Sequence, residues 1–100
     1  MKTNLISEIQ IIPIKPINGL VAFASFVLDN KFYLGSIGIM TRPFGGYRLV
    51  YPSKKVGTKN INTYYPINKE VARQIEVEVI NHLEDVMNNQ NDRHNSFNTQ

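Results

Sequence analysis

The sequence has no cysteine and only two histidines among its 100 residues. Without cysteine the chain has no disulfide framework, no thiolate nucleophile and no thiolate ligand for zinc or an iron–sulfur cluster. His82 and His94 have no partners at a spacing typical of a metal site, so the sequence predicts neither a metal nor a cofactor. We expect His82 to be a partly buried packing residue on a helix.

Long hydrophobic runs are also missing. The longest nearly apolar stretch, residues 20–28, has the length of a strand and falls short of the roughly 18 residues that a membrane-spanning helix needs. No small-residue cleavage site follows the apolar residues near the start, so we expect no secretion signal and a cytoplasmic location. The hydrophobic share of 42% and the charged share of 19% are typical of a globular protein, and the length favours one domain.

Motifs for catalysis are lacking as well. The pair Gly45-Gly46 is not followed by the lysine and hydroxyl residue of a phosphate-binding loop, which leaves a plain turn as the better interpretation. The carboxylates cluster on the outer face of the predicted helix rather than in a cleft that would shift their pKa values. The sequence therefore predicts that the protein is not an enzyme.

Negative charge is absent from the centre of the chain. Between Asn30 and Lys69 there is no acidic residue, while the same window carries seven lysines and arginines. Residues 1–69 have a net charge of +7 and residues 70–100 a net charge of −4. A stretch this long without a carboxylate predicts a surface that binds an anion.

The pattern of apolar residues predicts an α+β fold. Strands are expected over residues 5–14, 20–28, 31–40 and 47–51, with an optional fifth strand over 61–65. A bulge is expected near Ile11 and Ile12, and Pro13 and Pro16 predict that the first strand lies at a sheet edge. An amphipathic helix capped by Asn68 is expected from residue 69 to about 88. The prediction is thus an antiparallel sheet of four to five strands with one long C-terminal helix packed on it, a single domain over residues 1–88, and a flexible, disordered polar tail over 89–100.

The central hairpin predicts a dimer. A two-residue turn at Asp29-Asn30 would place Val27, Phe32 and Leu34 on one face of the sheet, where one helix cannot cover them if it already covers the other face. An uncovered apolar face of this size is commonly buried by a second copy of the chain. We therefore expect a homodimer whose interface includes these three residues; the alternative is that the first strand or the loop over 42–46 covers this face within one chain.

The acid-free window between Asn30 and Lys69 holds all but one of the candidate binding residues; the exception, Arg73, follows in the predicted helix. Lysine and arginine neutralise phosphates, and serine hydroxyls also bond phosphate oxygens. The alternative is that these lysines only keep loops solvated. The candidate nucleic-acid-binding residues are Arg48, Ser53, Lys54, Lys55, Lys59, Lys69 and Arg73, and residues 53–60 are expected to form a glycine-containing turn.

Four segments together resemble a known family. They are residues 6–11, 22–29, 46–55 with the box Pro52-Ser53-Lys54-Lys55, and 65–68 with Pro66-Ile67-Asn68 at the start of the helix. In this order they resemble the stage V sporulation protein G family of bacterial septation and gene regulators, over residues 4–87. The sequence departs from the family pattern at Lys55, where arginine is usual, at Tyr65, where histidine is common, and in a shorter loop over 56–63.

The resemblance implies a small α+β protein that dimerises through its sheet and regulates sporulation, septation and gene expression without catalysis. It implies binding to double-stranded DNA, and in some members to RNA. An alternative from another functional class is a protein–protein adaptor with no direct role for nucleic acid. A steep fall of binding with salt would separate the first function from the second.

Overall fold

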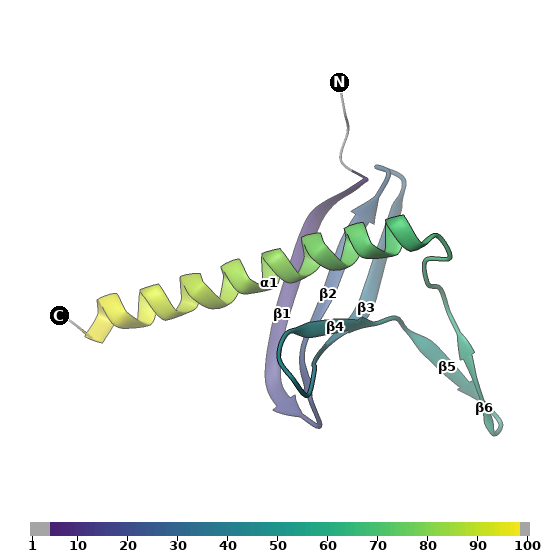
Figure 1. Cartoon of the computed structure of the whole chain (residues 1–100), viewed down its shortest axis with the longest axis horizontal. Helices are drawn as coiled ribbons and strands as arrows, with labels where there is room; N and C mark the ends of the chain where they lie inside the picture. The colour runs from purple at the N-terminus through teal and green to yellow at the C-terminus, as the bar shows by residue number, and fades with distance from the viewer. Residues whose placement is uncertain (1–4, 99–100) are drawn as a thin grey trace.

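The computed structural model describes the backbone of residues 5–98 and the side chains of residues 5–88. Its elements follow one another as six strands and a helix (Figure 1). The strands are β1 (Ile6–Ile17), β2 (Leu20–Leu28), β3 (Phe32–Thr41), β4 (Tyr47–Val50), β5 (Ser53–Val56) and β6 (Lys59–Asn62), and the helix is α1 (Lys69–Asn98). The predicted α+β class, with an antiparallel sheet and one C-terminal helix packed on it, is confirmed.

The main sheet is an antiparallel meander in the order β1-β2-β3-β4. Asn18 and Gly19 join β1 to β2 with φ values of 52° and 90°, which fit the type I′ turn that this pair favours. β1 is an edge strand, as its two prolines predict, because an edge strand has one side without ladder bonds. The predicted bulge near Ile11 and Ile12 is misplaced: the register shifts lie between Ser7 and Gln10, where Glu8 has a φ of 50°, and between Pro13 and Ile17.

The loop between β2 and β3 holds three residues rather than the predicted two. Asp29 and Asn30 have φ values of 52° and 55°, and the amide of Lys31 donates to the carbonyl oxygen of Leu28 at 2.9 Å. Lys31 is an extra residue in this connection, so Leu28 pairs with Phe32 instead of Lys31. The predicted pairing of the two strands is therefore wrong, by one residue next to the loop and by two residues beyond the irregularity between Ala24 and Phe26.

This shift changes which side chains share a face, because neighbouring residues of a strand point to opposite sides. Leu34 pairs with Phe26 and packs against the core under α1. Phe32 lies on the same side, where it lines a cavity together with Val71 of α1. Val27 pairs with Tyr33 on the other face. The predicted grouping of Val27, Phe32 and Leu34 on one face is thus wrong.

Helix α1 begins where the sequence predicts. The side-chain oxygen of Asn68 accepts a hydrogen bond from the amide of Val71 at 3.0 Å, and its carbonyl oxygen accepts one from the amide of Ala72 at 2.9 Å. An asparagine in this position satisfies amides that have no partner within the first turn of the helix. The cap fixes the point at which the chain leaves the β6–α1 connection and crosses the sheet.

The core lies between α1 and one face of the main sheet (Figure 1). Three helix residues spaced four positions apart, Ile75, Val79 and Leu83, are buried there. The sheet contributes aliphatic and aromatic side chains from its first three strands, namely Ile6, Ala22, Ala24, Phe26, Ile37 and Ile39. The other face of the main sheet, which points away from α1, is called the outer face below.

The helix runs to Asn98, past its predicted end near residue 88. The side chains of residues 89–98 lie outside the described part of the chain, so the flexibility predicted for residues 89–100 stays a prediction. Within the described residues, no stretch of helix is long and apolar enough to cross a lipid bilayer.

Candidate nucleic-acid interface

The segment predicted as a turn over residues 53–60 is instead part of a two-stranded ribbon, formed by β5 and β6. Gly57, with a φ of 63°, and Thr58 connect the strands, and Val56 pairs with Lys59 next to them. Glycine at the first position of such a two-residue connection fits a type II′ turn. Every residue of β5 and β6 is exposed, and the ribbon extends away from the main sheet and from α1 (Figure 1).

The base of the ribbon is anchored by two tyrosines that flank it in the sequence. The rings of Tyr51 and Tyr64 meet edge to face, with centroids 5.9 Å apart. The hydroxyl of Tyr64 donates a hydrogen bond to the carbonyl oxygen of Gly35 in β3, and the amide of Thr63 donates to the carbonyl oxygen of Pro52 at 2.9 Å. These contacts fix where the ribbon leaves the body of the protein, while its tip stays in solvent.

Burial changes the acidity of both tyrosines. Desolvation, followed by the influence of Tyr64 and Glu76, raises the pKa of Tyr51 to about 12. Desolvation and the neighbouring Tyr33 also raise the pKa of Tyr64. The hydroxyl of Tyr51 is buried and has no hydrogen-bond partner among the described residues. Both rings therefore remain neutral near pH 7 and act as packing groups at the base of the ribbon.

The ribbon brings four of the seven predicted binding residues together. Ser53, Lys54 and Lys55 form most of β5, and Lys59 begins β6 on the neighbouring strand. The two ion pairs found in the described part of the chain, Lys31–Asp29 and Arg42–Glu76, involve none of these lysines. With no acidic residue in either strand, the ribbon carries only positive side-chain charge.

The other three predicted residues lie elsewhere. Arg48 is on β4, where it pairs with Met40 and shares the outer face with Val50. Lys69 and Arg73 lie in the first turns of α1, on the opposite side of the main sheet. The seven residues therefore do not form one continuous patch, and the ribbon is the part that concentrates them.

The predicted set of binding residues does not include two further polar residues of the ribbon. Asn60 pairs with Lys55 and Asn62 pairs with Ser53 across the two strands, so each amide shares a face with a predicted binding residue. The sequence does contain a signal for them, since Gly57-Thr58 has the glycine-first pattern of a two-residue hairpin turn. Reading the segment as a single turn hid this pairing.

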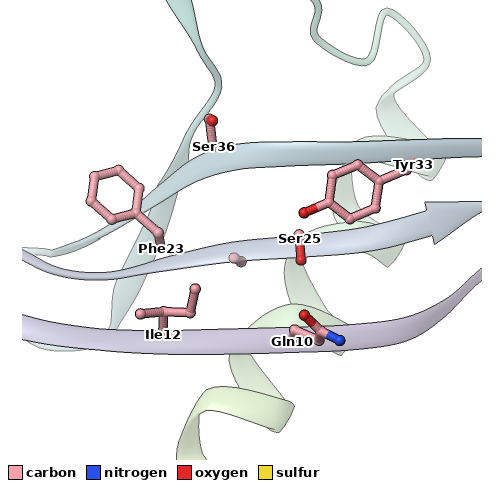
Figure 2. A pocket seen from close by; sticks show the side chains of 7 residues that line it. Gln10, Ile12, Phe23, Ser25, Tyr33 and Ser36 are labelled. Atoms are coloured by element: carbon pink, nitrogen blue, oxygen red, sulfur yellow. The ribbon is translucent and has the colours of Figure 1, made fainter.

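The outer face of the main sheet is a second exposed surface. Ile12, Phe23 and Tyr33 are exposed by 62%, 38% and 71%. Figure 2 shows Ile12 beside Phe23 at one end of a shallow hollow, and the ring of Tyr33 beside Ser25 at the other. The prediction that one sheet face lacks a helical cover is therefore correct, and of the three residues expected on this face Val27 lies on it, whereas Phe32 and Leu34 do not.

Another cavity lies between the start of α1 and the tip of the β2–β3 hairpin. It has a volume of about 310 Å³, and its walls are apolar apart from tyrosine hydroxyls. No group of three histidine, aspartate or glutamate side chains that could hold a metal ion occurs within the described residues. His82 is half-buried on α1, as predicted.

Comparison of the chain with models of known protein families gives no match, and comparison with curated protein sequences gives none either.

Proposed function

We propose that this protein is a non-enzymatic regulator that binds nucleic acid through the β5–β6 ribbon. The observation that carries the proposal is a projecting, fully exposed ribbon with three lysines and no acidic residue. Lysines that approach phosphates release condensed counterions, and this release is a major source of affinity for nucleic acids. The tyrosine anchor supports the same role, because a ribbon fixed at its base loses less conformational freedom on binding.

The resemblance to the stage V sporulation protein G family points to double-stranded DNA as the main ligand, with RNA as a second. It also points to a bacterial cytoplasmic protein that regulates septation, sporulation and gene expression. The box Pro52-Ser53-Lys54-Lys55, on which this resemblance depends most, forms the start of the ribbon. Family resemblance and ribbon chemistry thus favour the same segment.

We propose further that the protein acts as a homodimer joined through its outer face. Ile12, Phe23 and Tyr33 are large apolar or aromatic residues left in contact with solvent there. Soluble monomers seldom expose a contiguous apolar surface of this kind, and two-fold pairing of identical surfaces is the common way to cover it. A dimer carries two ribbons, which raises affinity for an extended polyanion through effective concentration.

The outer face also favours a second candidate function, an adaptor that holds another protein there. In that case the ribbon lysines matter little, and binding depends on apolar burial. The exposure of Phe23 and Tyr33 is compatible with both functions. The two differ in how binding responds to salt, since apolar burial is not weakened by screening as phosphate contacts are.

The proposed function is tested by measuring fluorescence anisotropy of labelled duplex DNA and single-stranded RNA with the full chain over a range of salt concentrations. We expect saturable binding whose logarithm falls linearly with the logarithm of salt, by about 0.9 for each phosphate contacted on duplex DNA. Absence of binding to both nucleic acids at low salt would contradict the proposal.

A further inference from the structure

The two faces of the ribbon differ in chemistry, and the pairing of its strands defines them. Val56 pairs with Lys59, and Lys54 pairs with Ile61. Because side chains alternate along a strand and paired residues share a face, these four side chains project from one side. The other side carries only short polar groups and one lysine, namely Ser53, Lys55, Asn60 and Asn62. We call this second side the amide face.

The amide face has the side chains that recognise base edges. Asparagine can donate to N7 and accept from the N6 amino group of adenine with one amide, lysine donates to O6 and N7 of guanine, and serine bonds to several bases. All four residues of this face are exposed. β6 pairs with β5 alone, and neither Asn60 nor Asn62 belongs to the core, so packing in the core does not account for these two side chains.

The shape of the ribbon fits one type of groove. The major groove of B-form DNA is about 12 Å wide and admits a two-stranded β-ribbon, whereas the major groove of A-form RNA is too deep and narrow for side chains to read. The ribbon is only two strands wide and extends from the body of the protein (Figure 1). We propose that it enters the major groove of duplex DNA with the amide face toward the base edges. This inference rests on the proposed function and assigns its substrate as B-form duplex.

The opposite side of the ribbon supplies the phosphate contacts. Lys54 lies on β5 and Lys59 on β6, so each edge of the ribbon carries one cation on this side. A ribbon in the groove has one sugar-phosphate wall beside each edge, and a long lysine side chain reaches the nearer wall. Lys54 and Lys59 thus contribute affinity for every sequence, while the amide face contributes the preference among sequences.

The test begins with wild-type protein and a pool of random DNA duplexes, from which bound sequences are selected and counted. The double variant Asn60→Ala/Asn62→Ala is then compared with the matched variant Lys54→Ala/Lys59→Ala. For each base contact that is lost, we expect the ratio of affinities for selected and unselected duplexes to fall by about 5- to 150-fold in the asparagine variant. The slope of log affinity against log salt should stay unchanged in this variant. We expect the lysine variant to bind all sequences more weakly and to keep the preference. Both pairs are exposed, and circular dichroism checks that the variants fold.

A second arm uses the selected duplex with 7-deazaadenine in place of adenine, which removes N7 from the major groove and leaves the phosphates intact. Wild-type affinity should fall, and the affinity of the asparagine variant should fall no further. Equal binding to an RNA duplex of the same sequence, no sequence preference in the wild type, or a preference that survives in the asparagine variant would each overturn the inference while leaving nucleic-acid binding in place. Failure of the wild type to bind any nucleic acid would instead overturn the proposed function as well.

Discussion

Lys54 and Lys55 are adjacent in the sequence but project from opposite faces of the ribbon, because Lys54 pairs with Ile61 and Lys55 pairs with Asn60. The two cations therefore do not form a single charged spot. One shares its side with the lysine of the neighbouring strand, and the other shares its side with two asparagines. In the proposed complex, Lys54 lies at a phosphate wall of the duplex and Lys55 lies at the base edges.

The tyrosines at the base of the ribbon give a matched pair of stability predictions. Tyr51→Phe removes a buried hydroxyl without a partner and keeps the ring, so the free energy of unfolding should stay unchanged or rise by up to about 1 kcal/mol. Tyr64→Phe removes the hydroxyl that donates to the carbonyl oxygen of Gly35, so the free energy of unfolding should fall by about 1 kcal/mol. Urea denaturation measures both. A large loss of stability in Tyr51→Phe would show that its hydroxyl is bonded.

Stability should fall in alkaline solution because of Tyr51. Its pKa is about 12 in the folded protein against 10.0 for the ordinary group. Above pH 10 the unfolded chain loses this proton first, so unfolding is favoured, and the contribution present below pH 10 is lost as the pH rises to about 12. The raised pKa of Tyr64 acts in the same direction. Urea denaturation of the wild type and Tyr51→Phe over this range should show a shallower decline in the variant; identical curves would exclude Tyr51 as a source.

The proposed dimer predicts a sedimenting mass near twice the 11.4 kDa of the chain at micromolar concentration. Phe23→Glu and Tyr33→Glu place a charge on the outer face and should give folded monomers with weaker DNA binding. Phe44→Glu is the matched control, since Phe44 is fully exposed on the β3–β4 loop. Leu34→Glu is not a suitable test of the dimer, because Leu34 packs against the core and a charge at this position should unfold the protein. A wild-type mass near 11.4 kDa would contradict the dimer.

Removal of residues 89–100 should leave the thermal midpoint of unfolding unchanged. This segment is rich in asparagine and has Phe97 as its only large apolar residue, so it has little to bury. Calorimetry of the truncated and full chains makes the comparison. A loss of several degrees would show that the segment packs on the rest of the protein.

The sequence predicts those parts of the fold whose signals are local. The spacing of Ile75, Val79 and Leu83 identifies the buried side of α1, and Asn68 identifies its first turn. Each of these patterns depends on residues within a few positions of one another. The same holds for the Asn18-Gly19 turn, whose backbone conformation follows from the two residue types.

The incorrect predictions concern features of the fold that depend on contacts between residues far apart in the sequence. The amide of Asp29 donates to the carbonyl oxygen of Leu5 at 2.7 Å, which ties the β2–β3 loop to the start of β1. Nothing within the loop itself distinguishes two residues from three, so the sequence predicts the wrong register and places Phe32 and Leu34, but not Val27, on the wrong face.

The two strands of the ribbon are not predicted from the sequence, because their composition is unusual for strands. Its short strands are rich in lysine and asparagine, which are uncommon in strands. It also lacks the buried face that usually reveals a strand through alternation. The anchors that hold it, Tyr51 and Tyr64, lie outside its strands and contact each other only in the folded protein. The basic residues could thus be identified from the sequence, but not the face on which each one lies.

The most direct test of the account is the salt dependence of duplex DNA binding in two variants that lose the same charge. Lys54→Ala/Lys59→Ala removes two ribbon cations, whereas Lys15→Ala/Lys31→Ala removes two exposed lysines from β1 and the β2–β3 loop. We expect the ribbon variant to flatten the slope of log affinity against log salt by roughly 2 units, at about 0.9 for each lost phosphate contact, and the control variant to keep the wild-type slope. Equal slopes in the wild type and both variants, with all three proteins folded, would contradict the assignment of the ribbon as the binding surface.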